Sequence, residues 1–333
     1  MFDVITFGSA AWDVFVDLPP IYVKRDDRLI AKRGFVLNMG SKIDIPGMRF
    51  SFGGGGVNTA TTFVRQGFKT AHCGMVGDDI PGREVVEHLK RLGVDTALVS
   101  KTVERPTNNS VVLNAAGEDR VIMVYRGASE LLDHKHINWE RLSAKLFYLA
   151  PLSGSLCRLT EQITAHARKS GAMVAVNLGN SQLAMGRSCI KSLLARIDVL
   201  VLNLEEAATM TGIDYANEKK IISETARIHP GINVITKGGK GAIITDRETV
   251  YEARLKKYKI VDVTGAGDAF ASGFMSGMLA MGNDIEYSMK LALVNAKHCL
   301  SVRGAGRLLA KEDNFLVDRE NIKIKKTPLD QIR

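Results

Sequence analysis

The 333-residue sequence lacks the features typical of zinc-binding, secreted or membrane-spanning proteins. It has only four cysteines, at positions 73, 157, 189 and 299, and no Cys-x-x-Cys pair, which excludes the spacing of a zinc or thioredoxin-like motif. Widely separated thiols are typical of a reducing compartment, and no basic leader precedes Asp13, so we expect a cytoplasmic location. No run of about 18 apolar residues occurs, so no membrane span is predicted.

A concentrated basic region is also missing. The chain has 45 Lys and Arg against 36 Asp and Glu, a formal net charge of +9, but the surplus is spread along the sequence. No basic run is interleaved with aromatic residues, as a nucleic-acid-binding surface would require. We therefore expect no nucleic-acid partner and no membrane partner.

The sequence alternates short apolar runs rich in β-branched residues with longer amphipathic segments. This alternation predicts an α/β fold with a mainly parallel sheet and helices on both faces. No internal repeat or low-complexity linker occurs, so residues 1–333 are expected to form a single domain. The predicted strands are 3–7, 70–76, 145–149, 173–177, 199–203, 233–237 and 242–245, and the predicted helices are 58–66, 82–92, 158–170, 188–196, 204–211 and 218–228.

Two segments interrupt the alternation. Residues 14–50 are rich in proline and glycine between short extended pieces, and residues 105–127 contain an expected hairpin, 110–114 and 120–125, with Gly117 in its turn. Together they could form a small β-sheet that acts as a lid, or they could be two surface excursions. Residues 311–333 are expected to form a peripheral C-terminal tail.

The strongest local motif is Thr264-Gly265-Ala266-Gly267-Asp268, which follows the apolar segment 260–263 and precedes a helical pattern. We expect 260–263 to be a strand and Asp268 to open a helix. Small residues let the backbone approach a ligand closely, and the first amides of a helix attract anions. Alternatively, Asp268 is only a favourable charge in the first helical turn.

The longer string Asp-x-Thr-Gly-Ala-Gly-Asp-Ala-Phe, residues 262–270, closely resembles the C-terminal signature of the ribokinase-like (PfkB) carbohydrate and nucleoside kinases. Four further elements resemble that family in the same order: the glycine-rich 51–60, Gly-Met-Val-Gly-Asp-Asp at 74–79, Asn-x-x-Glu at 203–206 and Thr-x-Gly-x-x-Gly at 236–241. A P-loop is excluded because no Gly-Lys-Ser or Gly-Lys-Thr occurs, and no glycine cluster has the spacing Gly-x-Gly-x-x-Gly of a dinucleotide site. The resemblance implies a ribokinase-like three-layer sandwich with a small β-sheet lid.

The resemblance implies a catalytic role for the 265–268 segment. Asp268 would accept the proton of an acceptor hydroxyl, while the amides of Gly265, Ala266 and Gly267 would form an anion hole for the phosphoryl group. Phosphoryl transfer depends mainly on alignment and charge stabilisation, so an oriented carboxylate is a sufficient base.

The resemblance also implies a site for ATP and Mg²⁺. Glu206 would bind Mg²⁺ through water, which is consistent with the few carboxylates that this ion uses. Asn203 and Glu206 also have the spacing of a helix capping box, and both roles can hold together. The residues implied in nucleotide binding are Asn203, Thr236, Gly238, Thr264 and Asn295.

Asp262 is implied in binding a monovalent cation, K⁺, together with the region 303–306, or it could simply bond local amides. The acceptor contacts implied by the resemblance are Asp13, Gly53, Gly54 and Asn58. A carboxylate and an amide suit the vicinal hydroxyls of a sugar.

Three positions depart from the ribokinase pattern. Ala11 replaces an asparagine, Gly55 replaces a lysine, and the segment 150–152, Ala-Pro-Leu, lacks an acidic residue. These changes argue against ribose and predict a more apolar pocket, with Trp12 nearby. We expect an ATP-dependent kinase of a small sugar, a nucleoside kinase as the alternative, or a non-catalytic sensor on the same fold. A homodimer through the lid edges is possible.

Overall fold

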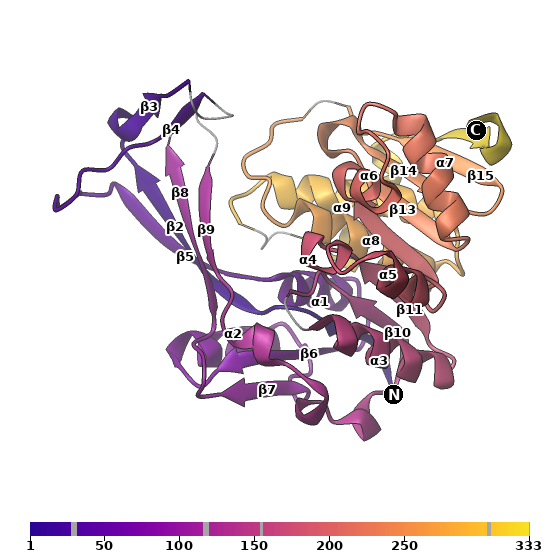
Figure 1. Ribbon diagram of the computed structural model, residues 1–333, viewed down its shortest axis with the longest axis horizontal. Helices are drawn as coiled ribbons and strands as arrows, with labels where there is room; N and C mark the ends of the chain where they lie inside the picture. Colours follow the sequence, from indigo (N-terminus) through magenta and orange to yellow (C-terminus); the bar gives the residue numbers. More distant parts are fainter. Residues whose placement is uncertain (28–31, 116–119, 154–155, 257, 305–307, 333) are drawn as a thin grey trace.

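A ten-stranded β-sheet runs through the computed structural model, which describes residues 1–27, 32–115, 120–153, 156–256, 258–304 and 308–332 (Figure 1). Seven neighbouring strands (β7, β6, β1, β10, β11, β12 and β13) are parallel, and the three beyond β13 (β14, β15 and β16) are each antiparallel to the strand before. In spatial order they are β16 (Lys325–Pro328), β15 (Thr249–Ala253), β14 (Ala242–Thr245), β13 (Ile232–Thr236), β12 (Val199–Asn203), β11 (Met173–Asn177), β10 (Ala144–Leu149), β1 (Phe2–Phe7), β6 (Thr70–Gly77) and β7 (Val99–Thr102).

The central strands are short apolar runs because both of their faces are covered. All eight residues of β6 are buried, as are the last four of β1 and of β10. Strands covered on both faces have nearly continuous hydrophobic sequences, which is the pattern that identified them. The predicted mainly parallel sheet is confirmed.

Helices cover both faces of this sheet and complete a three-layer sandwich, which confirms the predicted fold class (Figure 1). One layer consists of α3 (Leu156–Lys169), α5 (Arg187–Leu194), α6 (Leu204–Thr211) and α7 (Glu218–Ile228), and the other of α1 (Gly55–Arg65), α8 (Ala266–Ala280) and α9 (Ile285–Leu300). The remaining helices are α2 (Ile80–Arg91), α4 (Asn180–Leu183) and α10 (Phe315–Arg319).

A separate four-stranded sheet, called here the small sheet, projects from one side of the sandwich (Figure 1). Its order is β5 (Gly47–Gly53), β2 (Ala11–Leu18), β8 (Asn108–Ala115) and β9 (Val121–Tyr125). Strands β8 and β9 form the predicted antiparallel hairpin, while Gly117 in its turn lies outside the described residues. A two-stranded ribbon of β3 (Val23–Arg25) and β4 (Arg33–Phe35) lies between β2 and β5 in sequence.

Two expectations about the C-terminal part are wrong. Segment 260–263 is not a strand: Val261 N donates to Leu300 O at the end of α9, and Ile260 and Val263 are exposed. The edge of the sheet beyond β15 is instead taken by β16. Because β16 completes the sheet and Val317 and Leu329 are buried, the described residues 311–332 do not form the expected peripheral tail.

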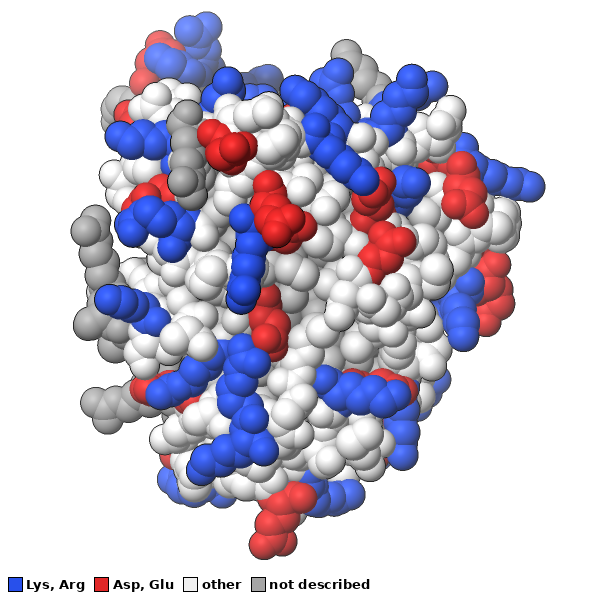
Figure 2. Space-filling model, turned by 90° about the vertical axis from the view of Figure 1, so that its right-hand side faces the viewer, with Lys and Arg blue, Asp and Glu red and all other residues white. Residues whose placement is uncertain are grey.

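One face of the molecule agrees with the spread of charge in the sequence. On the face drawn in Figure 2, basic and acidic side chains lie intermixed, without a continuous basic stripe. None of the described helices has the length and apolar character needed to cross a membrane.

Candidate active site

A cavity of about 240 Å³ opens at the carboxyl ends of β11, β12 and β13, where the first turn of α8 faces them. Carboxyl ends of parallel strands meet at one edge of the sheet, which is where open α/β sheets bind ligands. The cavity is lined by Asn177, Val201, Leu202, Asn203, Glu206, Thr236, Val263, Gly265, Ala266, Gly267 and Asp268. The structure thus brings together residues from three of the sequence motifs.

The first turn of α8 has the conformation that the Thr-Gly-Ala-Gly motif predicts. Gly265 is the residue before the helix and has a φ of 75°, a left-handed conformation that favours glycine. The helix begins at Ala266, so Asp268 is its third residue, not its first. The first backbone N–H groups of a helix lack internal acceptors and carry partial positive charge, so this turn can hold an anion.

Asp268 is fixed by a side chain from the other sequence half. Asn58 Nδ2, on α1, donates to Asp268 Oδ2 at 2.8 Å. Burial raises the pKa of Asp268 above its ordinary value, and the hydrogen bond from Asn58 partly offsets this rise. The carboxylate is therefore oriented and a stronger base than an exposed aspartate.

The glycine-rich turn at the start of α1 passes close to the carboxylates of Asp13 and Asp268. A Cβ on Gly53 would lie 2.0 Å from Asp13 Oδ2, and Gly54 has a φ of 91°, so neither position accommodates a side chain without rearrangement. A Cβ on Gly55 would lie 2.9 Å from the Cβ of Ala150 and 3.5 Å from Asp268 Oδ1. Two of the departures noted in the sequence, Gly55 and Ala150, are thus in contact with each other beside Asp268.

Asp13 lies on β2 with its carboxylate buried. Its Oδ1 has no hydrogen-bond partner, and burial raises its pKa while hydrogen bonding with Ser110 acts in the opposite direction. A buried acceptor atom without a donor is costly unless a ligand or water supplies one. Neighbouring residues of a strand face opposite sides, so Trp12 lies on the other face of β2 from Asp13, where it packs on Phe50 and Phe52.

Asn203 and Glu206 form the capping box that their spacing predicts. Glu206 N donates to Asn203 Oδ1 at 2.8 Å, and Asn203 N donates to Glu206 Oε2 at 2.7 Å. Burial raises the pKa of Glu206, which still lines the cavity. Asn177, Asn203 and Glu206 supply the oxygen donors that suit Mg²⁺, and one carboxylate agrees with a metal held mainly by phosphates and water.

Thr236 ends β13 at the cavity, and Gly238 begins a 3₁₀ turn two residues later. The intervening Lys237 is tied down, with its side chain 5% exposed and its Nζ 2.9 Å from Glu218 Oε1 and 2.7 Å from Glu252 Oε1. These ion pairs fix the turn that follows β13.

Asp262 joins two loops beside the Thr-Gly-Ala-Gly turn. Its Oδ1 accepts hydrogen bonds from Thr264 N and Oγ1 at 2.9 and 2.8 Å, and its Oδ2 accepts from Gly304 N at 2.9 Å. The alternative of local amide bonding is therefore realised. Residues 305 and 306 of the expected cation loop lie outside the described residues.

Asn295, expected at the nucleotide, lies in the core between α8 and α9. It is fully buried, its Nδ2 donates to Ala269 O at 2.7 Å, and its Oδ1 accepts from Leu309 N at 2.8 Å. It links α8, α9 and the following segment, and it is not among the residues that line the cavity.

Two residues beside the site were not singled out in the sequence. Asn177 lines the cavity, and its position as the polar end of an apolar strand was the available signal. Tyr148 is fully buried, and its pKa is raised well above the ordinary value by burial and by the nearby Asp268, while hydrogen bonding with Asn177 acts in the opposite direction. Nothing in the sequence distinguishes this tyrosine from an ordinary core residue.

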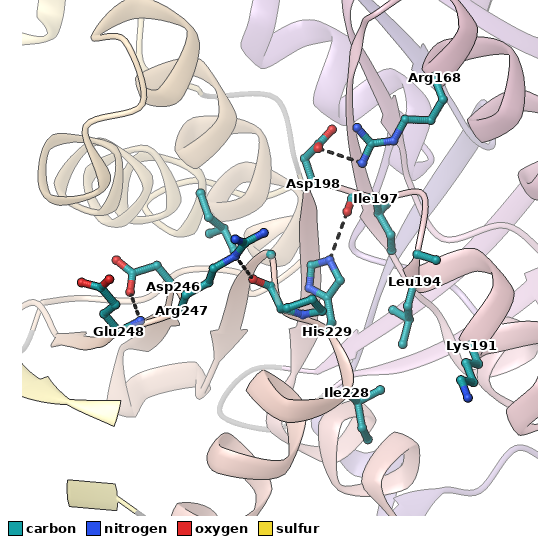
Figure 3. A pocket seen from close by; sticks show the side chains of 14 residues that line it. Arg168, Lys191, Leu194, Ile197, Asp198, Ile228, His229, Asp246, Arg247 and Glu248 are labelled. Atoms are coloured by element: carbon teal, nitrogen blue, oxygen red, sulfur yellow. Dashed lines mark hydrogen bonds and ion pairs between the residues drawn. The ribbon is translucent and has the colours of Figure 1, made fainter. Parts of the chain in front are cut away.

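A larger cavity, of about 680 Å³, lies at the amino ends of β12 and β13 (Figure 3). Several of its polar groups are already paired: Arg168 with Asp198 at 2.9 Å, His229 with Ile197 O at 3.2 Å, and Arg247 with Pro230 O at 3.1 Å. These contacts join structural elements to each other, so the smaller cavity is the candidate active site.

Comparison with known proteins agrees with this geometry. A family model described as pfkB family carbohydrate kinase matches residues 27–312. The chain is 27% identical over 243 residues to a ribokinase from Haemophilus influenzae, covering 69% of this chain and 75% of that protein.

Solved structures share the fold over nearly the whole chain. Arabidopsis thaliana ribokinase, complexed with ribose and ATP, is 21% identical, with a TM-score of 0.78 and coverage of 95% of this chain and 98% of that one. A nucleoside kinase from Burkholderia thailandensis, in complex with inosine, is 18% identical, with a TM-score of 0.75 and coverage of 96% and 98%. The chain therefore belongs to the pfkB family of carbohydrate kinases and is a carbohydrate or nucleoside kinase, a phosphotransferase with an alcohol group as acceptor.

Proposed function

We propose that the protein transfers the γ-phosphoryl group of ATP to a hydroxymethyl group of a small carbohydrate. The observation that carries this proposal is the position of Asp268, held by Asn58 at 2.8 Å in the first turn of α8 beside the cavity. A base and an anion-binding turn on the same few residues are what an in-line phosphoryl transfer to a hydroxyl requires.

Asp268 accepts the proton of the acceptor hydroxyl as that oxygen bonds to phosphorus. The amides of Gly265 and Gly267 stabilise the charge of the equatorial phosphoryl oxygens, since these donors are fixed before the reaction. The amide of Ala266, the third expected member of the anion hole, donates to Val263 O at 3.3 Å and joins them only if it leaves that carbonyl. The bond to the leaving ADP oxygen breaks in the same step, and the proton remains on Asp268 until product release.

The donor nucleotide lies along the carboxyl ends of β12 and β13. Asn203, Thr236, Gly238 and Thr264 contact the nucleotide in this proposal, supported by the presence of Asn203 and Thr236 in the cavity wall. Glu206 would hold Mg²⁺ through water, and the ion would supply positive charge that neutralises the phosphates.

The acceptor lies between the glycine-rich turn and the small sheet. Asp13 binds acceptor hydroxyls through its unpartnered Oδ1, and Asn58, Gly53 and Gly54 form the adjoining wall. A nucleoside is the alternative acceptor, favoured by the absence of polar side chains at Gly55 and Ala150 next to Asp268.

Asp262 is the candidate for a monovalent-cation effect, since it already joins segments 262–264 and 303–304. If K⁺ binds between these loops, turnover is higher in K⁺ than in a Tris buffer without alkali cations. Equal rates in the two buffers would remove this part of the proposal.

The small sheet acts as the lid of a single ribokinase-like domain in this proposal. Its face opposite Asp13 is apolar: Met48 is 53% and Phe50 57% exposed, next to Trp12. Large exposed apolar patches are typical of interaction surfaces, which favours a homodimer through this face. Analytical ultracentrifugation of wild type and Phe50→Glu tests it.

The function is tested by measuring ADP formation from ATP·Mg²⁺ with pentoses, hexoses and nucleosides. One acceptor class should be phosphorylated, and Asp268→Asn should keep nucleotide binding while losing most turnover. Unchanged turnover in Asp268→Asn contradicts the base assignment. Thermal stabilisation by an acceptor without any turnover would instead support a non-catalytic sensor.

A further inference from the structure

An ion pair joins the small sheet to the body of the protein. Arg303, which follows α9, places Nη1 3.3 Å from Asp17 Oδ2 and 3.4 Å from Asp17 Oδ1. Asp17 lies on β2 of the small sheet, where Arg49 of β5 also donates to it, at 2.9 and 3.3 Å. Asp17 therefore has one arginine from its own sheet and one from the body.

Backbone contacts place the same two parts against each other. A Cβ on Gly304 would lie 3.0 Å from Ser51 Oγ and 3.9 Å from the ring of Phe15. Ser51 is on β5 and Phe15 on β2, so the loop after α9 touches two strands of the small sheet next to the Arg303–Asp17 pair.

This loop is also bonded to the proposed catalytic turn. Gly304 N donates to Asp262 Oδ2 at 2.9 Å, and the other oxygen of Asp262 accepts from Thr264 N, one residue before Gly265. A continuous series of contacts thus runs from Asp17 through Arg303 and Gly304 to Asp262 and the first turn of α8.

We propose that Arg303 is a positioning residue that holds the small sheet closed over the acceptor and in register with the anion-binding turn. The inference rests on the proposed function, since it assigns Arg303 a part in the same reaction. Closure excludes water from the phosphoryl group and fixes the acceptor near Asp268. The charged side chain never touches the reacting atoms, so its effect is on acceptor affinity and on loss of phosphoryl groups to water.

The alternative is an ordinary surface ion pair without functional effect. Arg303 is 55% exposed, and exposed pairs contribute about 0.2–1 kcal/mol, a factor of about 1.4 to 5 in an equilibrium. This factor sets the expected size of the change in acceptor affinity when the Arg303–Asp17 pair is removed. Arg227, 68% exposed and paired with Glu224 on α7, is a matched control.

The kinetic experiment compares wild type with Arg303→Gln, Arg303→Lys and Arg227→Gln. Arg303→Gln should raise KM for the acceptor about two- to fivefold and should increase the ADP released per acceptor phosphorylated. Its kcat at saturating acceptor should stay close to wild type. Arg303→Lys should restore most of the difference, and Arg227→Gln should match wild type.

A double-mutant cycle tests whether the effect passes through Asp17. In the Asp17→Ala background, where the partner of Arg303 is removed, Arg303→Gln should cause no further increase in KM for the acceptor. An undiminished effect in the Asp17→Ala background, or an acceptor KM for Arg303→Gln equal to that of Arg227→Gln, overturns the proposal.

Hydrogen exchange provides a readout that does not depend on activity. Amides of β2 and β5 should exchange faster in Arg303→Gln than in Arg227→Gln, because the closed arrangement is less populated. If wild type phosphorylates no acceptor, the proposed function fails, while this comparison still tests the closure contact. Equal exchange in the two variants overturns the positioning role even if the protein is an active kinase.

Discussion

Replacing Gly267 by alanine should separate stability from activity. Gly267 lies in the first turn of α8, lines the cavity, and an added Cβ would meet no heavy atom within 4 Å. Alanine is favoured over glycine within helices by about 0.5–1 kcal/mol, so Gly267→Ala should be neutral or slightly stabilising. The open space beside Gly267 is the place proposed for the phosphoryl group. The methyl group of an alanine at position 267 would push the phosphoryl group away from the amides.

The expected result is a kcat/KM reduced at least about tenfold, towards the 10²–10³ that loss of an oxyanion donor costs, with an unchanged or higher melting temperature. Gly273→Ala is the matched control on the same helix, because its Cβ would lie 3.1 Å from Ala292 Cα and from Asn295 Cβ. It should destabilise by about 1–3 kcal/mol while the folded fraction keeps its kcat. Wild-type kcat/KM in Gly267→Ala would falsify the assignment of this turn as the anion site.

Three further predictions concern buried titratable groups. Asn58→Ala removes the hydrogen bond to the Asp268 carboxylate, and a bond of this kind contributes about 1.5–3 kcal/mol. The pKa of Asp268 should then rise further, and the acid limb of the kcat/KM–pH profile should move to higher pH. An acid limb that does not move contradicts the assignment of Asp268 as the base. Burial raises the pKa of Asp268, so its negative charge lowers the stability of the fold above that pKa. In urea unfolding at pH 8, Asp268→Asn should therefore be about 1 kcal/mol more stable than wild type, and equal or lower stability contradicts a raised pKa. Burial lowers the pKa of His72 to about 4. The neutral imidazole therefore contributes its full share to the free energy of unfolding above pH 6.5, and about 3 kcal/mol of this is lost as the pH drops towards 4. His72→Gln should remove that part of the pH dependence.

The architecture of the main sheet was largely predictable because its strands are local apolar runs. The bounds of β11, β12 and β14 match the predicted ranges. Segment 260–263 is also mainly apolar but forms no strand, and Val261 N donates instead to Leu300 O. The sheet edge beside β15 is taken by β16, a Lys-rich segment without a strand pattern. Which segment pairs at a sheet edge depends on tertiary contacts that local sequence does not carry.

The candidate site was predictable where a motif restricts the backbone. Gly265 and the Asn203–Glu206 pair have the conformations that their residue types favour. Asn295 and Tyr148 were beyond sequence reasoning, because burial and the neighbours across α8 and β10 decide whether a polar side chain faces a ligand or the core.

The pairing of β16 with β15 has a consequence for folding during synthesis. Strand β15, residues 249–253, is complete more than 70 residues before its partner at 325–328 leaves the ribosome. Until then one edge of the sheet has unpaired N–H and C=O groups, which can pair with another chain. The newly made protein is thus most exposed to aggregation late in translation, on the antiparallel side of the sheet, away from the proposed anion-binding turn.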